Sequence, residues 1–360
     1  MPSIIQPNTR PKVLVLGSPK YAGDDFLAEF QKSHDVTTIN PPTRAALLAT
    51  LPATTATHGP FAAVIARVDP APYDPFDAAL LAPLLPHLRL LASAQAGHDA
   101  FDLPLLTRRR VWFCNSRDAV ADATADVALL LLLAVVRDAV GAAGALRGGR
   151  WRGGVAPTAD VADVVVGVVG MGAVGRAFAR RVVRGLGGRV VYWTRAGRVA
   201  GEVERAVVGE EGEGMLRCCG SLGELLAVAD VVSLHVPLSE GTKGLVGREE
   251  LAMMKRGSYL LNTARGGVVD EEALIEALES GHVRRAGLDV FEGEEDGGKG
   301  IREYWLKSDK VVVLPHMGGL TERALGKAQR ECFENVRRFF ETGRPVAPVN
   351  EVDELSEKGK

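Results

Sequence analysis

The segment 164–176 constrains the fold of this chain more than any other part of it. It begins as an apolar run, which predicts a buried strand, and passes directly into the pattern G-x-G-x-x-G ahead of a helical pattern. The three glycines are Gly170, Gly172 and Gly175. In a dinucleotide fingerprint the first permits a tight turn, the second lets the backbone approach the pyrophosphate, and the third lets helix and strand pack closely. The segment therefore predicts a dinucleotide-binding βαβ unit, with the pyrophosphate at the helix start.

Apolar runs and helical patterns alternate along most of the chain. Strands are expected at 12–17, 61–66, 88–93, 189–193, 231–236, 258–262, 286–291 and 311–314. Helices are expected at 24–31, from 122 to about 140, and from 321 to 342. The segments 144–157, 209–214 and 351–360 read as a loop, an acidic surface loop and a frayed tail. This alternation predicts α/β architecture, with parallel sheets covered by helices on both faces, and 360 residues predict two domains.

Composition and charge argue against several classes of protein. The 43 basic and 45 acidic residues give a net charge of −2, which favours neither a nucleic-acid partner nor a membrane surface. The most apolar run, 127–136, is shorter than the roughly 20 residues of a bilayer span and reads as a buried helix. The four cysteines form no C-x-x-C, so we expect no disulfide framework, no zinc site and no other metal. Without a signal-peptide pattern at the N-terminus, these features predict a reducing, cytoplasmic location.

The end of the second strand in the nucleotide-binding unit bears on the choice of cofactor. An Asp or Glu about 20 residues beyond the glycines binds the ribose hydroxyls of NAD and repels a 2′-phosphate. That position is Thr194, which is followed by Arg195 and then by Arg198. A missing carboxylate together with two guanidinium groups favours NADP, because arginine can bind phosphate bidentately. The alternative is that both arginines are exposed loop residues and that the cofactor is NAD.

Three polar side chains follow later strands of the same series. Arg265 lies just past the strand at 258–262, Glu294 lies past 286–291, and His316 lies past 311–314. The carboxyl ends of parallel strands line one crevice, so these groups are expected to converge beside the nicotinamide. Each alone has a structural explanation, as a surface ion pair, a loop acid or a buried hydrogen-bonded histidine. Together, behind a dinucleotide fingerprint, they favour a catalytic constellation.

The order of these motifs resembles the D-isomer-specific 2-hydroxyacid dehydrogenase family, and within it the fungal D-mandelate dehydrogenase-like and glyoxylate or hydroxypyruvate reductase-like branches. The resemblance covers nearly the whole chain and is carried by the segments 96–102, 123–126, 170–175, 234–238, 262–270, 287–294 and 315–319. It implies a Rossmann cofactor domain at 121–324, inserted into a flavodoxin-like substrate domain at 1–120 and 325–360. It also implies a homodimer formed through the cofactor domains, to which the apolar helix at 124–136 contributes unless it is interior.

The resemblance places the family's catalytic arginine, glutamate and histidine on Arg265, Glu294 and His316. It implies reduction of a small 2-keto acid to the (R)-2-hydroxy acid, with His316 as the proton donor, Glu294 as its partner and Arg265 on the substrate carboxylate. Val68, Ala96 and Gly97 are implied to complete the substrate site. The further cofactor contacts implied are Thr124, Ala173, Val174, His235, Val236, Pro237, Thr263, Ala264, Asp289 (toward the carboxamide) and Gly318.

The chain departs from the family pattern in two places, and two other functions occur on the same scaffold. Proline often follows the glutamate in the family, whereas here Glu295 and the glycine-rich segment 296–300 follow Glu294. The choice of Glu294 over Glu292 or Glu295 therefore rests on the spacing in the family. The usual acid after the second strand is also missing. A nucleotide-sensing regulator of the corepressor type is the alternative function, although no basic face or extended disordered arm supports it. Formate oxidation uses an amide where this chain has Glu294. Glyoxylate, hydroxypyruvate, phenylglyoxylate and branched-chain keto acids are all compatible with the sequence.

Overall fold

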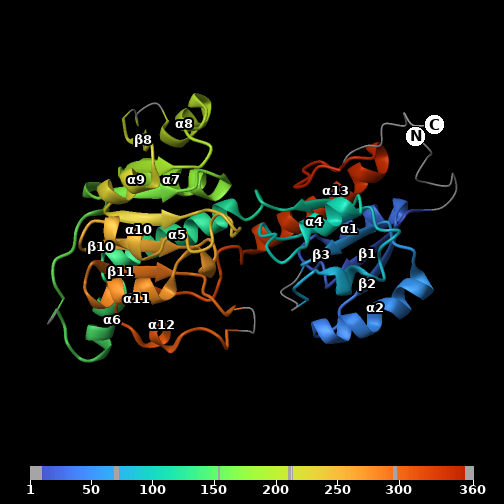
Figure 1. Ribbon diagram of the computed structural model, residues 1–360, viewed down its shortest axis with the longest axis horizontal. Coiled ribbons are helices and arrows are strands. Elements are labelled where there is room, and N and C mark those ends of the chain that lie inside the picture. Colours follow the sequence, from blue (N-terminus) through green and yellow to red (C-terminus); the bar gives the residue numbers. More distant parts are fainter. Residues whose placement is uncertain are drawn as a thin grey trace. The chain divides into compact units, whose positions relative to one another are not determined.

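The computed structural model describes residues 10–68, 73–152, 155–209, 212, 214–294 and 298–352. The chain divides into two compact units (Figure 1), the first formed by Met1–Val120 with Leu320–Lys360 and the second by Ala121–Gly319. The chain passes back from the second unit to the first between residues 319 and 320, whereas the resemblance implied a boundary between 324 and 325. The reason is that helix α13 (Glu322–Thr342) packs along its length on strands of the first unit.

The first unit is built on a parallel five-stranded sheet in the order β2-β1-β3-β4-β5, the order of flavodoxin-like folds. Its strands are β1 (Lys12–Leu16), β2 (Asp35–Ile39), β3 (Ala63–Ala66), β4 (Leu90–Ser93) and β5 (Trp112–Asn115). Helices α2 (Arg44–His58), α3 (Ala78–Leu81) and α4 (Leu103–Arg108) share one apolar core with the sheet. Helices α1 (Asp24–Ser33) and α13 share the other, so both faces of the sheet are covered.

The second unit is built on a parallel seven-stranded sheet in the order β12-β11-β10-β9-β6-β7-β8. Its strands are β6 (Val165–Val169), β7 (Arg189–Trp193), β8 (Leu216–Cys218), β9 (Val231–Leu234), β10 (Ser258–Asn262), β11 (Val283–Leu288) and β12 (Val311–Val313). The chain runs outward from β6 in one direction and returns at β9 to run in the other. This is the Rossmann order with an added edge strand, and its topological switch point lies between β6 and β9.

Helices cover both faces of the second sheet as well. One face packs on α5 (Ala121–Val136), α7 (Ala173–Leu186) and α8 (Gly201–Val208). The other packs on α9 (Leu222–Val228), α10 (Arg248–Met253), α11 (Glu271–Glu279) and α12 (Glu303–Lys307). Two doubly wound parallel-sheet units confirm the predicted fold class.

Some elements differ from those predicted from the sequence. The apolar helix ends at Val136 rather than near residue 140, because Asp138 takes a left-handed conformation with φ 52°. A separate helix, α6 (Ala139–Arg147), follows and occupies the start of the predicted loop at 144–157. The strands β2, β5 and β8 were not predicted. Half of the predicted acidic loop at 209–214 and most of the predicted tail at 351–360 lie outside the described residues.

The apolar helix α5 is mostly buried in the second unit. Within the ranges given above, no single helix is both long enough and apolar enough to cross a bilayer. Helices α5 and α6 meet the length and hydropathy requirements only when taken together, and they are bent by 62° relative to each other.

Candidate functional site

The glycine turn between β6 and α7 lies at the switch point of the second sheet. Gly170 has φ 96°, and a Cβ there would come within 2.7 Å of the His235 carbonyl oxygen. A Cβ on Gly175 would come within 2.1 Å of the Gly170 carbonyl oxygen. Packing inside the unit therefore requires glycine at both positions. A Cβ on Gly172 would meet no described atom within 4 Å, so packing within the unit does not require glycine there. Close approach of a bound group, such as a pyrophosphate, to the backbone explains this glycine better.

The start of α7 offers backbone donors at this turn. Gly172 is the N-cap and carries no side chain, so the first N–H groups of the helix, which include those of Ala173 and Val174, have no capping side chain. Such orphan donors, together with the positive end of the helix dipole, form an anion site.

The carboxyl end of β9 lies beside the same turn, and β10 is the next strand of the sheet. His235 donates its backbone N–H to the Val169 carbonyl (2.8 Å), and its Nε2 lies 2.9 Å from Ser233 Oγ. Burial lowers the pKa of His235 to about 3, so the ring is neutral near pH 7. His235 Nδ1 and the hydroxyl of Thr263 are buried without a hydrogen-bond partner among the described residues. Unpaired buried polar atoms of this kind call for a partner from outside the chain, and a dinucleotide supplies suitable groups.

The predicted ribose end of the site contains an ion pair that the sequence did not predict. Thr194 donates its hydroxyl to the Gly197 carbonyl (2.8 Å), which closes a turn after β7. Arg198 binds both carboxylate oxygens of Glu204, through Nε (3.0 Å) and Nη2 (2.7 Å). The hydroxyl of the buried Tyr192 donates to Glu204 Oε1 (2.7 Å), and the bond from Arg198 lowers the pKa of Glu204. Glu204 therefore already balances the charge of Arg198, whereas Arg195 is exposed with Nη1 about 3.4 Å from where a Cβ on Gly241 would lie.

The turn that carries Arg265 follows β10 and is held from within. Buried Asn262 accepts the Ala264 N–H (3.0 Å) and donates to the Arg265 carbonyl (2.9 Å). Arg265 Nη1 donates to the Ala264 carbonyl (2.7 Å), and the side chain is half-buried. A Cβ on Gly266 would lie 2.1 Å from the backbone carbon of Phe291, so only glycine lets this turn pack on the segment that leads to Glu294.

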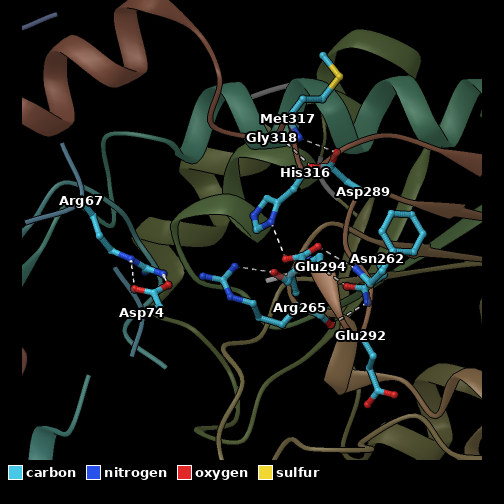
Figure 2. A network of polar contacts seen from close by, with 12 residues as sticks. Arg67, Asp74, Asn262, Arg265, Asp289, Glu292, Glu294, His316, Met317 and Gly318 are labelled. Carbon is cyan, nitrogen blue, oxygen red and sulfur yellow. Dashed lines mark hydrogen bonds and ion pairs between the residues drawn. The ribbon is translucent and has the colours of Figure 1, made fainter. Parts of the chain in front are cut away.

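His316 and Glu294 meet although 22 residues separate them. Figure 2 shows the pair: His316 Nδ1 lies 2.7 Å from Glu294 Oε1, with the Arg265 side chain extending beside them. Glu294 Oε2 accepts the Phe291 N–H (3.0 Å), which fixes the carboxylate from its own turn. The His316 side chain is 47% exposed and that of Glu294 is 20% exposed, so the pair is accessible and its imidazole is oriented by a carboxylate. Glu292 points away from His316 (Figure 2), whereas Glu294 reaches it; Glu295 lies outside the described residues.

Asp289 holds the loop that carries His316. Its Oδ1 accepts the Met317 N–H (2.8 Å) and its Oδ2 accepts the Gly318 N–H (2.9 Å), while its carbonyl accepts the His316 N–H (2.8 Å). Burial raises the pKa of Asp289, and the two N–H donors oppose that rise. His316 itself adopts φ 51°, a conformation that needs such support in a residue other than glycine. A Cβ on Gly318 would lie 3.1 Å from both Asp289 Oδ2 and Thr124 Cγ2, so Thr124, Asp289 and Gly318 form one cluster.

The residues predicted for the substrate site lie in the first unit, past the ends of β3 and β4. Val68 is buried and its carbonyl accepts the side-chain amide of Gln329 (2.6 Å). The preceding Arg67 has φ 56° and pairs with Asp74 through Nε (3.1 Å) and Nη2. The Ala96 carbonyl accepts the side-chain amide of Asn115, and Gly97 follows it. Val68 follows β3, which borders the switch point of the five-stranded sheet between β1 and β3, where ligands bind in open α/β sheets. Ala96 and Gly97 follow the next strand, β4.

In the part of the chain that the structure describes, no group of three or more His, Cys, Asp or Glu side chains is placed to hold a metal ion.

Comparison with known proteins identifies the family of this chain. Residues 129–318 match the model of the D-isomer specific 2-hydroxyacid dehydrogenase NAD binding domain. "Dehydrogenase efuE" of Hormonema carpetanum is 45% identical over 352 residues, which are 98% of this chain and 84% of that protein.

Solved structures agree with the sequence relatives. The apo form of Rhodotorula graminis D-mandelate dehydrogenase matches with a TM-score of 0.82 and 33% identity, covering 96% of this chain and 99% of that one. An NADPH-dependent glyoxylate/hydroxypyruvate reductase from Sinorhizobium meliloti, in complex with NADP and malonate, matches with a TM-score of 0.74 and 26% identity, covering 95% and 97%. With these matches and a dinucleotide turn on a Rossmann sheet, the chain belongs to the D-isomer-specific 2-hydroxyacid dehydrogenase family and is an NAD(P)-dependent oxidoreductase.

Proposed function

We propose that this enzyme reduces a small 2-keto acid to the (R)-2-hydroxy acid, with Arg265, Glu294 and His316 as its catalytic residues. The observation that carries the proposal is the His316–Glu294 pair, 2.7 Å apart past two strand ends of the Rossmann sheet. A paired imidazole is the group needed to protonate the oxygen of a ketone under reduction.

The cofactor would be held by the residues around the glycine turn. The backbone donors of Ala173 and Val174 suit the pyrophosphate, and the unpaired His235 Nδ1 and Thr263 hydroxyl suit its polar groups. Thr124, Val236, Pro237, Ala264, Asp289 and Gly318 complete the set that we assign to the cofactor. When bound, the nicotinamide supplies the hydride.

The three catalytic side chains divide the remaining work. His316 holds the proton that the substrate oxygen takes up, and Glu294 orients the imidazole through the hydrogen bond at Nδ1. Arg265 binds the substrate carboxylate through its guanidinium fork and stabilises the negative charge that develops on the carbonyl oxygen. In the reverse direction the neutral imidazole takes the proton back from the alcohol.

The two units would divide binding between them. We assign cofactor binding to the second unit, because it contains the glycine turn and the residues that match the NAD-binding family model. We assign the substrate site of the first unit to Val68, Ala96 and Gly97, which follow β3, at the switch point, and its neighbour β4. The four cysteines are free, which is compatible with the reducing cytoplasm. We therefore propose a cytoplasmic location for the enzyme. Localisation of a fluorescent fusion protein to another compartment would contradict this proposal.

The reaction can be tested by oxidation of NADPH and NADH with a panel of 2-keto acids. The relatives act on substrates of different size, so the panel should contain glyoxylate, hydroxypyruvate, phenylglyoxylate and a branched-chain keto acid. Turnover of at least one member supports the proposal. Cofactor binding without turnover of any member supports a nucleotide-sensing regulator instead.

We propose that NADP is preferred over NAD, through Arg195 with a contribution from Arg198. Arg195→Ala is expected to lower the ratio of kcat/KM for NADPH to that for NADH by about tenfold, the worth of a charge-assisted bond to phosphate. Arg189→Ala is the matched control, because it removes an exposed arginine at the opposite end of the same strand. An unchanged ratio in Arg195→Ala would exclude a 2′-phosphate contact there and favour NAD.

We propose that the enzyme is a homodimer formed through its second unit. Helices α5 and α6 and the segment after them carry exposed apolar side chains, namely Leu130, Val140, Leu146 and Trp151, of which Trp151 is 74% exposed. Light scattering should give twice the chain mass of 38.3 kDa, and Leu146→Glu should lower it toward one chain. Leu306→Glu, on α12, is the control for a charge placed on another exposed leucine. A wild-type mass of one chain would contradict the proposal.

A further inference from the structure

Glu271 is a buried acid that none of the roles above uses. It is the first residue of α11 and is only 5% exposed. Its Oε1 accepts the backbone N–H of Glu292 (2.9 Å), and its Oε2 accepts Arg302 Nε (2.9 Å). A carboxylate is rarely buried without a partner, and this one is held by a charged donor on one oxygen and a backbone donor on the other.

The backbone that Glu271 holds is the turn that delivers Glu294. Glu292 lies two residues before Glu294, and within the same turn Phe291 donates its N–H to Glu294 Oε2. Gly266 packs directly on the backbone of Phe291 and Glu292 from the Arg265 side. The turn is thus fixed on one side by the Arg265 loop and on the other by the first turn of α11.

Arg302 ties the far end of the same segment to Glu271. It is the N-cap residue of α12, and the Gly300 N–H donates to the Gly293 carbonyl (3.2 Å). Glu271 therefore contacts the chain both before and after the loop that contains Glu294. A shift in this loop would move the carboxylate that orients His316.

We propose that Glu271 is a positioning residue of the catalytic pair: by holding the Glu292 N–H and Arg302, it fixes the turn from which Glu294 reaches His316. The inference rests on the proposed function, because it needs Glu294 to act on His316 in the reaction. Glu271 does not touch the reacting atoms, and its effect on the rate passes through Glu294.

The neighbouring acid on the same helix provides a matched control. Glu272 is 74% exposed and reaches only Arg302 Nη1, at 3.4 Å. Removing either carboxylate changes the charge beside Arg302, but only Glu271 supports the backbone at Glu292.

The test is a double-mutant cycle on kcat, made with Glu271→Ala, Glu294→Gln and the double variant. Glu271→Ala should lower kcat about tenfold while leaving the KM for the nicotinamide cofactor unchanged. In the Glu294→Gln background the same change should cost almost nothing further, since residues that act through one another are not additive. Glu271→Gln, whose amide oxygen can still accept the Glu292 N–H, should stay closer to the wild type, and Glu272→Ala should match the wild type.

Two outcomes overturn the inference. One is an equal loss of kcat on removing Glu271 in both backgrounds, as a merely structural role would give. The other is a Glu271→Ala variant that matches Glu272→Ala. If the alanine variant does not fold, Glu271→Asp takes its place in both backgrounds, because its carboxylate is one methylene shorter and withdraws from the Glu292 N–H. His316→Ala distinguishes this result from a failure of the proposed function. Normal turnover in that variant would show that the His316–Glu294 pair is not catalytic. Lost turnover together with an additive cycle would reject only the positioning role of Glu271.

Discussion

Replacing His316 with alanine is expected to lower kcat for keto-acid reduction by about 100-fold or more, the usual contribution of a positioned general acid. The expectation rests on the 2.7 Å contact between His316 Nδ1 and Glu294, which leaves Nε2 as the ring nitrogen that we propose for proton transfer to the substrate oxygen. Binding of the nicotinamide cofactor should change little, because the contacts that we assign to it lie at the glycine turn and the neighbouring strand ends. The measurement is steady-state oxidation of the preferred reduced cofactor, with cofactor affinity followed by fluorescence.

An exposed histidine elsewhere in the chain provides the control for this result. His87 lies on the surface of the first unit, and His87→Ala should leave kcat at the wild-type value. If the His316→Ala variant retains nearly full kcat, His316 is not the general acid of the reaction. Its pairing with Glu294 would then have no catalytic role.

Replacing Arg265 with lysine is expected to lower kcat/KM for the keto acid by about 100-fold, the scale for loss of a donor at a developing oxyanion. Lysine keeps the charge but cannot make the two parallel bonds of a guanidinium to a carboxylate. The Asn262 bonds and the close packing of Gly266 hold the backbone of this turn, so the variant should keep its fold and lose substrate orientation.

The matched comparison is Arg284→Lys on strand β11. Arg284 is exposed, and the same exchange there should leave kcat/KM unchanged. If Arg265→Lys also leaves it unchanged, the substrate carboxylate is bound by another group, and the assignment of Arg265 fails.

The parts of the fold that the sequence predicted are those with a strong local cause. The strands β6, β9 and β10 are buried almost throughout, and their sequences are apolar runs. Glycine is needed at Gly170 and Gly175 because a Cβ at either position would overlap a backbone oxygen. The strands that escaped prediction include β2 and β8, two edge strands that are only partly buried and therefore carry no clear apolar pattern. Helix α6 escaped because its glycines resemble a loop, while its alanines favour a helix.

The parts of the candidate site that escaped prediction depend on contacts between distant segments. Glu204 lies on α8, and nothing in its own segment reveals that it binds Arg198 and the Tyr192 hydroxyl. Asp289 was expected at the cofactor, but its second contact, with the N–H groups of the His316 loop at both carboxylate oxygens, could not be predicted from its own segment. The choice between Glu292 and Glu294 required the direction of each side chain within one tight turn, which spacing alone does not give.

The most direct test of the central claim is the transfer of deuterium from NADPH or NADH labelled at C4 of the nicotinamide to a 2-keto acid. We expect one deuterium at C2 of an (R)-2-hydroxy acid, formed by the wild type and formed about 100-fold more slowly, or slower still, by His316→Ala. A labelled cofactor that binds but passes no deuterium to any keto acid of the panel would contradict the account.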